Sequence, residues 1–171
     1  MTVTAGGLVL PAPTAQAATT RDAAEVSGTN TAAKAVRSVK QVAQQTAVAR
    51  QKVKARTAVA VAEDQIGDPY SFGATGPGSF DCSGLVQYAW KKAGVKIPRV
   101  TNSQFARIKK KVSWKNLKPG DLMFFHGLGH VGMYVGNGKM VHSPRTGSTV
   151  RVEKLNGWRK ASFVGAVRPG L

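Results

Sequence analysis

The sequence predicts an α+β domain in which helices precede an antiparallel sheet. Residues 57–66 and 82–93 show helical patterns, whereas after residue 118 short apolar segments alternate with turn residues. Helices that come first, with strands afterwards, are typical of α+β domains and not of alternating βαβ folds. We therefore expect the helices to pack on an antiparallel sheet.

Each helix has a recognisable end. The first is predicted at residues 57–66 and ends at Gly67, a favourable residue just after a helix. A glycine-rich loop follows, up to Phe80. The second helix is predicted to begin at Cys82 and to end at Gly94, after two lysines that favour a helix C-terminus.

The strands are expected after the turn at residues 118–121. LMFF (122–125) is continuously apolar and predicts a buried strand, whereas HVGMYVG (130–136) alternates and leads through GNGK into MVHS (140–143). A three-residue hairpin loop at 136–138 places His130 and His142 on one face of the sheet, whereas a two-residue loop places them on opposite faces. We prefer the three-residue loop because the apolar side chains then share the other face: Val131, Met133, Val135 and Val141.

Composition divides the chain into three parts. Residues 1–18 are uncharged, mildly apolar and contain a small-x-small pattern at 15–17, which predicts a signal peptide whose usual basic start is missing. Residues 19–56 carry eight Lys or Arg and two acids without any aromatic residue, which predicts a basic, partly helical linker. Residues 57–171 hold every aromatic residue, all three histidines and the single cysteine, and form the predicted domain.

The balance of 25 Lys and Arg against 8 Asp and Glu gives a net charge of +17 and predicts attraction to polyanions. The export-like N-terminus and the lack of a nucleic-acid motif argue against nucleic acid, so we expect anionic wall polymers to bind through the basic linker. The apolar segment near the start is too short to span a bilayer. We expect a monomer without stable membrane insertion.

Cys82 lies in the first turn of its predicted helix, with Asp81 or Ser79 as the capping residue. A helix N-terminus lowers the pKa of a thiol, as does a neighbouring imidazolium. Many free cysteines are only small buried hydrophobes, but here two histidines on one sheet face supply a base and a residue that orients it. His126 forms an H-x3-H pair with His130, but it lies in a non-helical glycine segment without a second ligand pair, so we expect a loop residue and no metal.

Five segments together resemble the NlpC/P60 family of cell-wall peptidases over residues 58–168: PYSFGA (69–74), FDCSGLVQYAW (80–90), IPR (97–99), LKPGDLMFF (117–125) and GHVGMYVGNGKMVHSP (129–144). The resemblance implies a papain-like domain in which Cys82 is the nucleophile, His130 the general base and His142 the residue that orients it.

The resemblance also implies a substrate and its contacts. Tyr70 stands beside the nucleophile, and Asp81 and Ser83 receive the free amino end of a peptidoglycan stem peptide. The implied reaction is hydrolysis between D-γ-glutamate and the diamino acid, without metal or cofactor, by a secreted, wall-associated enzyme. Two alternatives stay open: an amidase or acyltransferase on the same scaffold, and a non-catalytic basic module that binds wall polymer.

Overall fold

The computed structural model describes residue 2 and residues 25–171, so the predicted signal peptide at 1–18 lies outside the described residues apart from residue 2. The chain divides into two units between Gln41 and Val42. Within the first unit, the described residues 25–41 form the beginning of helix α1 (Glu25–Glu63). The second unit holds the remainder of α1 and all the other elements.

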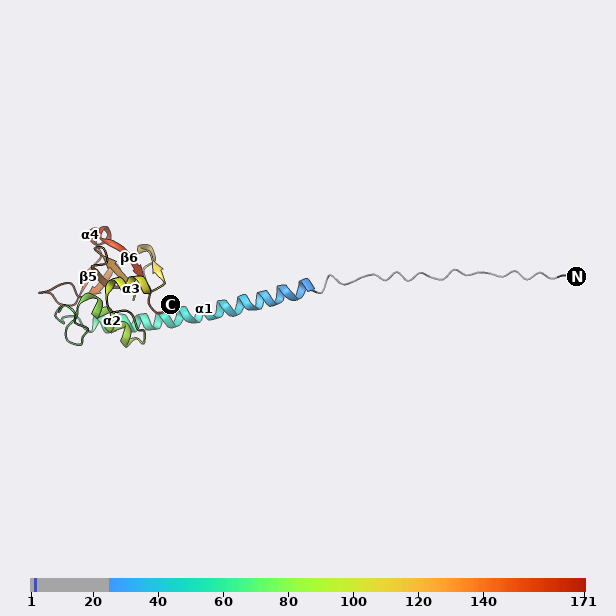
Figure 1. Cartoon of the computed structure of the whole chain (residues 1–171), viewed down its shortest axis with the longest axis horizontal. Coiled ribbons are helices and arrows are strands. Elements are labelled where there is room, and N and C mark those ends of the chain that lie inside the picture. Colours follow the sequence, from blue (N-terminus) through green and yellow to red (C-terminus); the bar gives the residue numbers. More distant parts are fainter. Residues whose placement is uncertain (1, 3–24) are drawn as a thin grey trace. The chain divides into compact units, whose positions relative to one another are not determined.

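A six-stranded antiparallel sheet with strand order β1-β6-β2-β3-β4-β5 forms the centre of this second unit (Figure 1). The prediction of an α+β fold with an antiparallel sheet is therefore confirmed. The elements after α1 are α2 (Cys82–Lys92), α3 (Thr101–Arg107), β1 (Lys111–Val112), the 3-10 helix η1 (Trp114–Asn116), β2 (Leu122–Phe125), β3 (His130–Gly136), β4 (Lys139–His142), β5 (Arg151–Lys154), α4 (Gly157–Ala161) and β6 (Phe163–Val167).

Helix α1 extends further toward the N-terminus than the sequence pattern predicts. The helix expected at 57–66 is only the last part of α1, which ends at Glu63. The predicted boundary between linker and domain thus falls inside a helix, and Gln51 and Ala55, on the linker side of it, are both buried. Gln51 Nε2 donates to the carbonyl of Pro169 at 3.1 Å. The last part of the predicted linker therefore packs on the domain.

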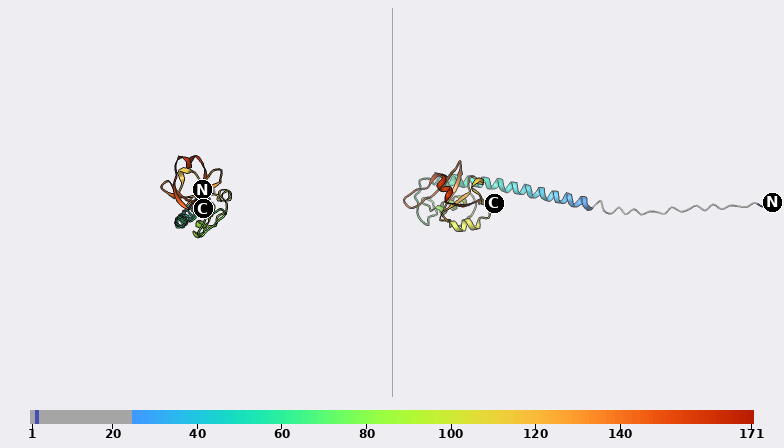
Figure 2. Two further views of the ribbon diagram at one scale, coloured as in Figure 1. Left: turned by 90° about the vertical axis from the view of Figure 1, so that its left-hand side faces the viewer. Right: turned by 90° about the horizontal axis from the view of Figure 1, so that it is seen from above.

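Apolar side chains cover both faces of the sheet. On one face, α1 and α2 pack against β2, β3 and β4, with Trp90 of α2 and Phe124 of β2 both fully buried. On the other face, Met123 and Phe125 of β2 pack with Met140 and with Trp114 of η1. Since β2 contributes side chains to both cores, all four of its residues are apolar. Figure 2 gives two further views of these elements.

The β3–β4 hairpin reaches the predicted register by a different turn. Gly136 pairs with Lys139, so the loop has two residues, and a register shift between Tyr134 and Gly136 adds one residue to β3. This bulge has the same effect on register as a longer loop. Met133 pairs with Val141, which places Gly132 opposite His142. The predicted loop length is wrong, whereas the predicted pairing at the histidines is confirmed.

Candidate active site

The start of helix α2 holds Cys82 in a fixed position. Asp81 is the N-cap residue, in extended conformation, and its carboxylate accepts from the N–H of Gly84 at 2.7 Å. The Asp81 N–H donates in turn to the carbonyl of Ala74 at 3.1 Å. The chain just before Asp81 is fastened to the end of β4, because Ser143 Oγ donates to the carbonyl of Phe80 at 2.7 Å.

Gly84 is required where α2 begins, because a Cβ there would lie 2.1 Å from the carbonyl oxygen of Ala74. Gly84→Ala must therefore push the helix start away from the glycine-rich loop, and we expect a loss of about 2 kcal/mol in the free energy of unfolding. Urea denaturation measures this loss. Gly157→Ala is the matched control, since no atom lies within 4 Å of the added Cβ; an equal effect of the two substitutions contradicts the steric explanation.

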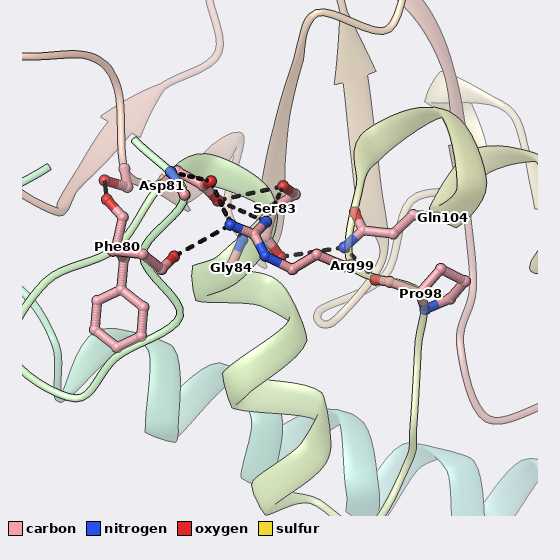
Figure 3. A network of polar contacts seen from close by, with 10 residues as sticks. Phe80, Asp81, Ser83, Gly84, Pro98, Arg99 and Gln104 are labelled. Carbon is pink, nitrogen blue, oxygen red and sulfur yellow. Dashed lines mark hydrogen bonds and ion pairs between the residues drawn. The ribbon is translucent and has the colours of Figure 1, made fainter. Parts of the chain in front are cut away.

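Arg99 links the residues on either side of Cys82 (Figure 3). Its Nη2 lies 2.5 Å from Oδ2 of Asp81, and its Nη1 donates to Asp81 Oδ1 at 3.0 Å and to Ser83 Oγ at 2.8 Å. Gly73 N–H also donates to the same carboxylate, at 3.0 Å. Although burial alone raises the pKa of Asp81, these donors lower it below its ordinary value. Asp81 is therefore an ionised carboxylate whose charge is compensated within the protein.

Arg99 belongs to the IPR segment, but nothing in its sequence context predicts a role for it. It pairs with the carboxylate of Asp81 and with the hydroxyl of Ser83, so both predicted residues beside Cys82 are already engaged by one guanidinium. Tyr70 lies next to this cluster through a bridge with Phe80. Burial raises the pKa of Tyr70, and the nearby Cys82 and Asp81 raise it further. The structure thus brings together all the predicted residues around the start of α2: Tyr70, Asp81, Cys82 and Ser83.

The thiol itself does not have the lowered pKa that its helix position predicts. Burial raises the pKa of Cys82, and the Asp81 charge adds to this effect. Hydrogen bonds from the backbone N–H groups of Val131, Ser83 and Cys82 itself oppose the rise without reversing it. Cys82 is partly buried and packs against the core that includes Val131, the residue of β3 that follows His130. At neutral pH the resting group is a thiol that needs a base.

The two predicted histidines are in direct contact. Nε2 of His130 lies 2.9 Å from Nδ1 of His142, and the ring centroids are 5.1 Å apart. His142 is fully buried and His130 is half-buried. Burial lowers the pKa of His130 to about 3, and the neighbouring His142 adds to this shift. Burial also lowers the pKa of His142 to about 4. Both imidazoles are therefore neutral at pH 7.

Glu153 of β5 extends this pair to a chain of three residues. Its Oε2 lies 3.1 Å from Nε2 of His142, a close contact without the linear geometry of a hydrogen bond. Arg159 of α4 donates from Nε to the other oxygen, Oε1, at 2.6 Å. That hydrogen bond lowers the pKa of Glu153 to about 2, so its carboxylate is ionised at neutral pH. Neither Glu153 nor Arg159 is among the residues predicted from the sequence.

An ionised carboxylate determines where the ring protons lie. Since it can only accept, the proton of neutral His142 is favoured on Nε2, which faces Glu153. Nδ1 of His142 then accepts from Nε2–H of His130. This arrangement leaves Nδ1 of His130 as a free lone pair, the form that a general base requires.

The same histidines make the fold sensitive to acid. Their pKa values in the folded protein lie below the ordinary 6.5, so the unfolded chain binds protons more readily as the pH falls. Their contribution to stability is complete above pH 6.5 and is lost as the pH falls toward 4. We expect His142 alone to cost about 2 kcal/mol between pH 7 and pH 5. Urea denaturation at these two pH values checks this expectation, and equal stabilities contradict it.

The histidines open onto a cavity of about 310 Å³, lined also by His126, Arg145, Arg151 and Trp158. His126 lies in the turn before β3, as predicted for a loop residue, and its ring is tilted by 49° against that of Trp158, with the ring centroids 5.1 Å apart. Within the described part of the chain, no three His, Cys, Asp or Glu side chains gather as metal ligands. None of the helices described has the length and apolar character that crossing a bilayer requires.

Comparisons with known proteins show which family the chain resembles. The model of the NlpC/P60 family matches residues 67–168. Probable endopeptidase p60 of Listeria monocytogenes is 41% identical over 107 residues, which cover 60% of this chain and 22% of that protein. Murein DD-endopeptidase MepH of Escherichia coli is 41% identical over 144 residues, which cover 76% of this chain and 53% of that protein.

Among solved structures, the peptidoglycan hydrolase RipB of Mycobacterium tuberculosis superposes with a TM-score of 0.62 at 32% identity, covering 70% of this chain and 66% of that one. An NlpC/P60 family protein from Bacillus cereus gives a TM-score of 0.61 at 36% identity, and the match covers 67% of this chain and 39% of that one. The chain thus spans between about a fifth and about a half of the length of the two curated relatives.

Proposed function

The chain belongs to the NlpC/P60 family, and on that premise we propose that it is a cysteine endopeptidase that hydrolyses the stem peptides of peptidoglycan. The observation that carries the proposal is the chain of contacts from Glu153 through His142 to His130, at the start of the strand whose Val131 belongs to the core against which Cys82 packs. A module that only binds wall polymer has no need of a thiol beside an oriented base. Relatives named as endopeptidases and as a peptidoglycan hydrolase support the same substrate.

The reaction begins with two neutral groups. His130 Nδ1 removes the thiol proton as the Cys82 sulfur attacks the amide carbonyl, and the backbone N–H of Cys82 at the start of α2 stabilises the oxyanion. His130 then protonates the leaving amine, and the C–N bond breaks to give a thioester on Cys82. Water, deprotonated by His130, attacks the thioester, and the peptide acid and the free thiol are released. The charge that develops on His130 is shared with His142 and compensated by Glu153.

We propose the bond between D-γ-glutamate and the diamino acid as the scissile bond. The family resemblance supports it, and stem peptides outside the cell membrane require a secreted, wall-associated enzyme. The printed name of MepH points to a second candidate, a D,D bond in the cross-link between two stems. An amidase or an acyltransferase on the same scaffold is a further alternative, since the fold does not determine the bond.

Digestion of purified peptidoglycan, followed by mass spectrometry of the released muropeptides, distinguishes these reactions. The proposed cleavage releases the first two stem residues as a dipeptide from stems with a free amino end, and leaves them on the sugar where the stem is still attached to the glycan. A D,D-endopeptidase converts cross-linked dimers into monomers with longer stems, and an amidase releases peptides that carry no sugar. Absence of any product that depends on Cys82 contradicts the proposal.

A further inference from the structure

A second concave surface shares no lining residue with the cavity beside the histidines. It is a groove of about 990 Å³, formed within the second unit by α1, the segment before β1, the turn before β2 and the segment after β6. Strands β1 and β6 lie at one end of the sheet order, whereas the histidines lie on β3 and β4. All the charged side chains that line the groove are basic: Lys52, Arg56, Lys109, Lys110, Lys118 and Arg168.

Buried contacts hold the walls of this groove together. Gly120 lies so close to α1 that a Cβ on it would approach the Cβ of Ala55 to 2.7 Å. Gln51 bonds the carbonyl of Pro169, and the N–H of Arg168 donates to the carbonyl of Lys110 at 2.8 Å. The groove is thus fixed by packing between distant segments and does not depend on flexible surface side chains.

The charge in the groove is largely uncompensated. Arg168 is paired with the buried Asp121, with contacts of 2.8 and 2.7 Å. The other five basic residues of the groove are exposed and make no ion pair with any acid among the described residues. Five unpaired cations around one concavity favour a partner with several negative charges.

The rest of the lining indicates what kind of polyanion fits. Ala47, Val48, Ala55 and Pro119 provide an apolar surface that can contact a carbon backbone. No aromatic side chain lines the groove, so it offers no platform on which nucleic-acid bases can stack. Its volume and the spread of its charges over four segments exceed what a single small anion needs.

We propose that this groove binds a linear, phosphate-bearing polymer of the cell wall, with polyol phosphate as the recognised chemistry. The site differs from the predicted basic linker, because its cations come from the folded domain as well as from α1. It also does not depend on peptide hydrolysis, so it can be tested in a chain that lacks the proposed nucleophile.

The test measures binding of purified poly(glycerol phosphate) to the full chain carrying Cys82→Ala, over a range of NaCl concentrations. We expect a groove variant, Lys52→Gln with Lys109→Gln and Lys110→Gln, to weaken binding at least about 10-fold and to reduce the slope of log Kd against log salt by roughly 2. The matched control removes the same charge from exposed positions in the first unit: Lys34→Gln, Arg37→Gln and Lys40→Gln. It should weaken binding by a clearly smaller factor than the groove variant, because the basic linker adds only a general electrostatic attraction.

A third variant with arginine at the three groove positions keeps the charge and should bind like the parent chain. Equal losses in the groove and control variants overturn the proposal, because binding then follows net charge alone. Undetectable binding by the parent chain also overturns it. Tighter binding to a single-stranded oligodeoxynucleotide of equal charge overturns the choice of a wall polymer.

Discussion

Cys82→Ala is expected to reduce the hydrolysis of a soluble stem peptide at least about 10³-fold, and His130→Ala is expected to do the same. Removing the sulfur eliminates the group that forms the acyl-enzyme. Removing the imidazole leaves a half-buried thiol whose pKa is raised by desolvation, with no base to take its proton. His142→Ala should cost less, because His142 orients the base without accepting the thiol proton.

Steady-state kinetics on the soluble peptide, with each variant's melting temperature as a check of folding, measures these effects. Alkylation of wild-type protein with iodoacetamide should abolish activity in the same way. Full activity after complete alkylation of Cys82 contradicts the assignment of the nucleophile.

Glu153→Gln is expected to lower kcat about 10- to 100-fold with little change in KM. The substitution keeps the shape of the side chain but removes the negative charge that compensates the protonated histidine pair. A glutamine amide can also donate to Nε2 of His142, which places the proton of His142 on Nδ1. Nε2 of His130 then accepts from His142, so the proton of His130 lies on Nδ1, the nitrogen that must act as the base. Glu153→Asp, which keeps the charge, should recover part of the lost activity.

Nitrogen-15 NMR of the histidine rings separates this role from a structural one. In the wild type at pH 7, we expect the proton of His142 on Nε2, and in Glu153→Gln we expect a substantial population of the other tautomer. Glu63→Gln removes the same charge from an exposed position of α1 and should leave both the tautomer and kcat unchanged. Wild-type kcat in the Glu153→Gln variant contradicts the role of Glu153.

The features of the site that could be predicted from the sequence are those in which the spacing of neighbouring residues alone determines where a side chain lies. The capping of α2 by Asp81 follows from a polar residue just before a helical pattern. The shared face of His130 and His142 follows from the alternation of apolar residues in β3 and β4. Even the incorrect loop length led to the correct register, because the bulge near Val135 adds the residue that the turn lacks.

Features that depend on distant contacts could not be predicted in this way. Glu153 faces His142 because Arg151 pairs with His142 and the side chain two residues later lies on the same face. The segment RVEK has no clear strand pattern, so nothing in it marked Glu153. Likewise, α1 is rich in Ala and Val, and only its contacts with Gly120 and Pro169 reveal that its residues 51 and 55 belong to the core.

The raised pKa of Cys82 has the same origin. A helix N-terminus and a neighbouring imidazolium both predict a lowered pKa, but burial raises the pKa of Cys82, and His130 is neutral at pH 7 and contributes no positive charge. We therefore expect proton transfer to accompany the attack of the sulfur, without a stable thiolate–imidazolium pair beforehand.

Trapping of the acyl-enzyme tests the central proposal most directly. The protein is mixed with a soluble stem peptide, quenched in acid within the first turnover and digested, and the peptide that contains Cys82 is examined by mass spectrometry. We predict an added mass equal to the acyl portion on the amino-terminal side of the cleaved bond, located on Cys82 and absent in Cys82→Ser. Turnover by the wild type without any adduct on Cys82, together with undiminished turnover by Cys82→Ser, would contradict the proposed mechanism.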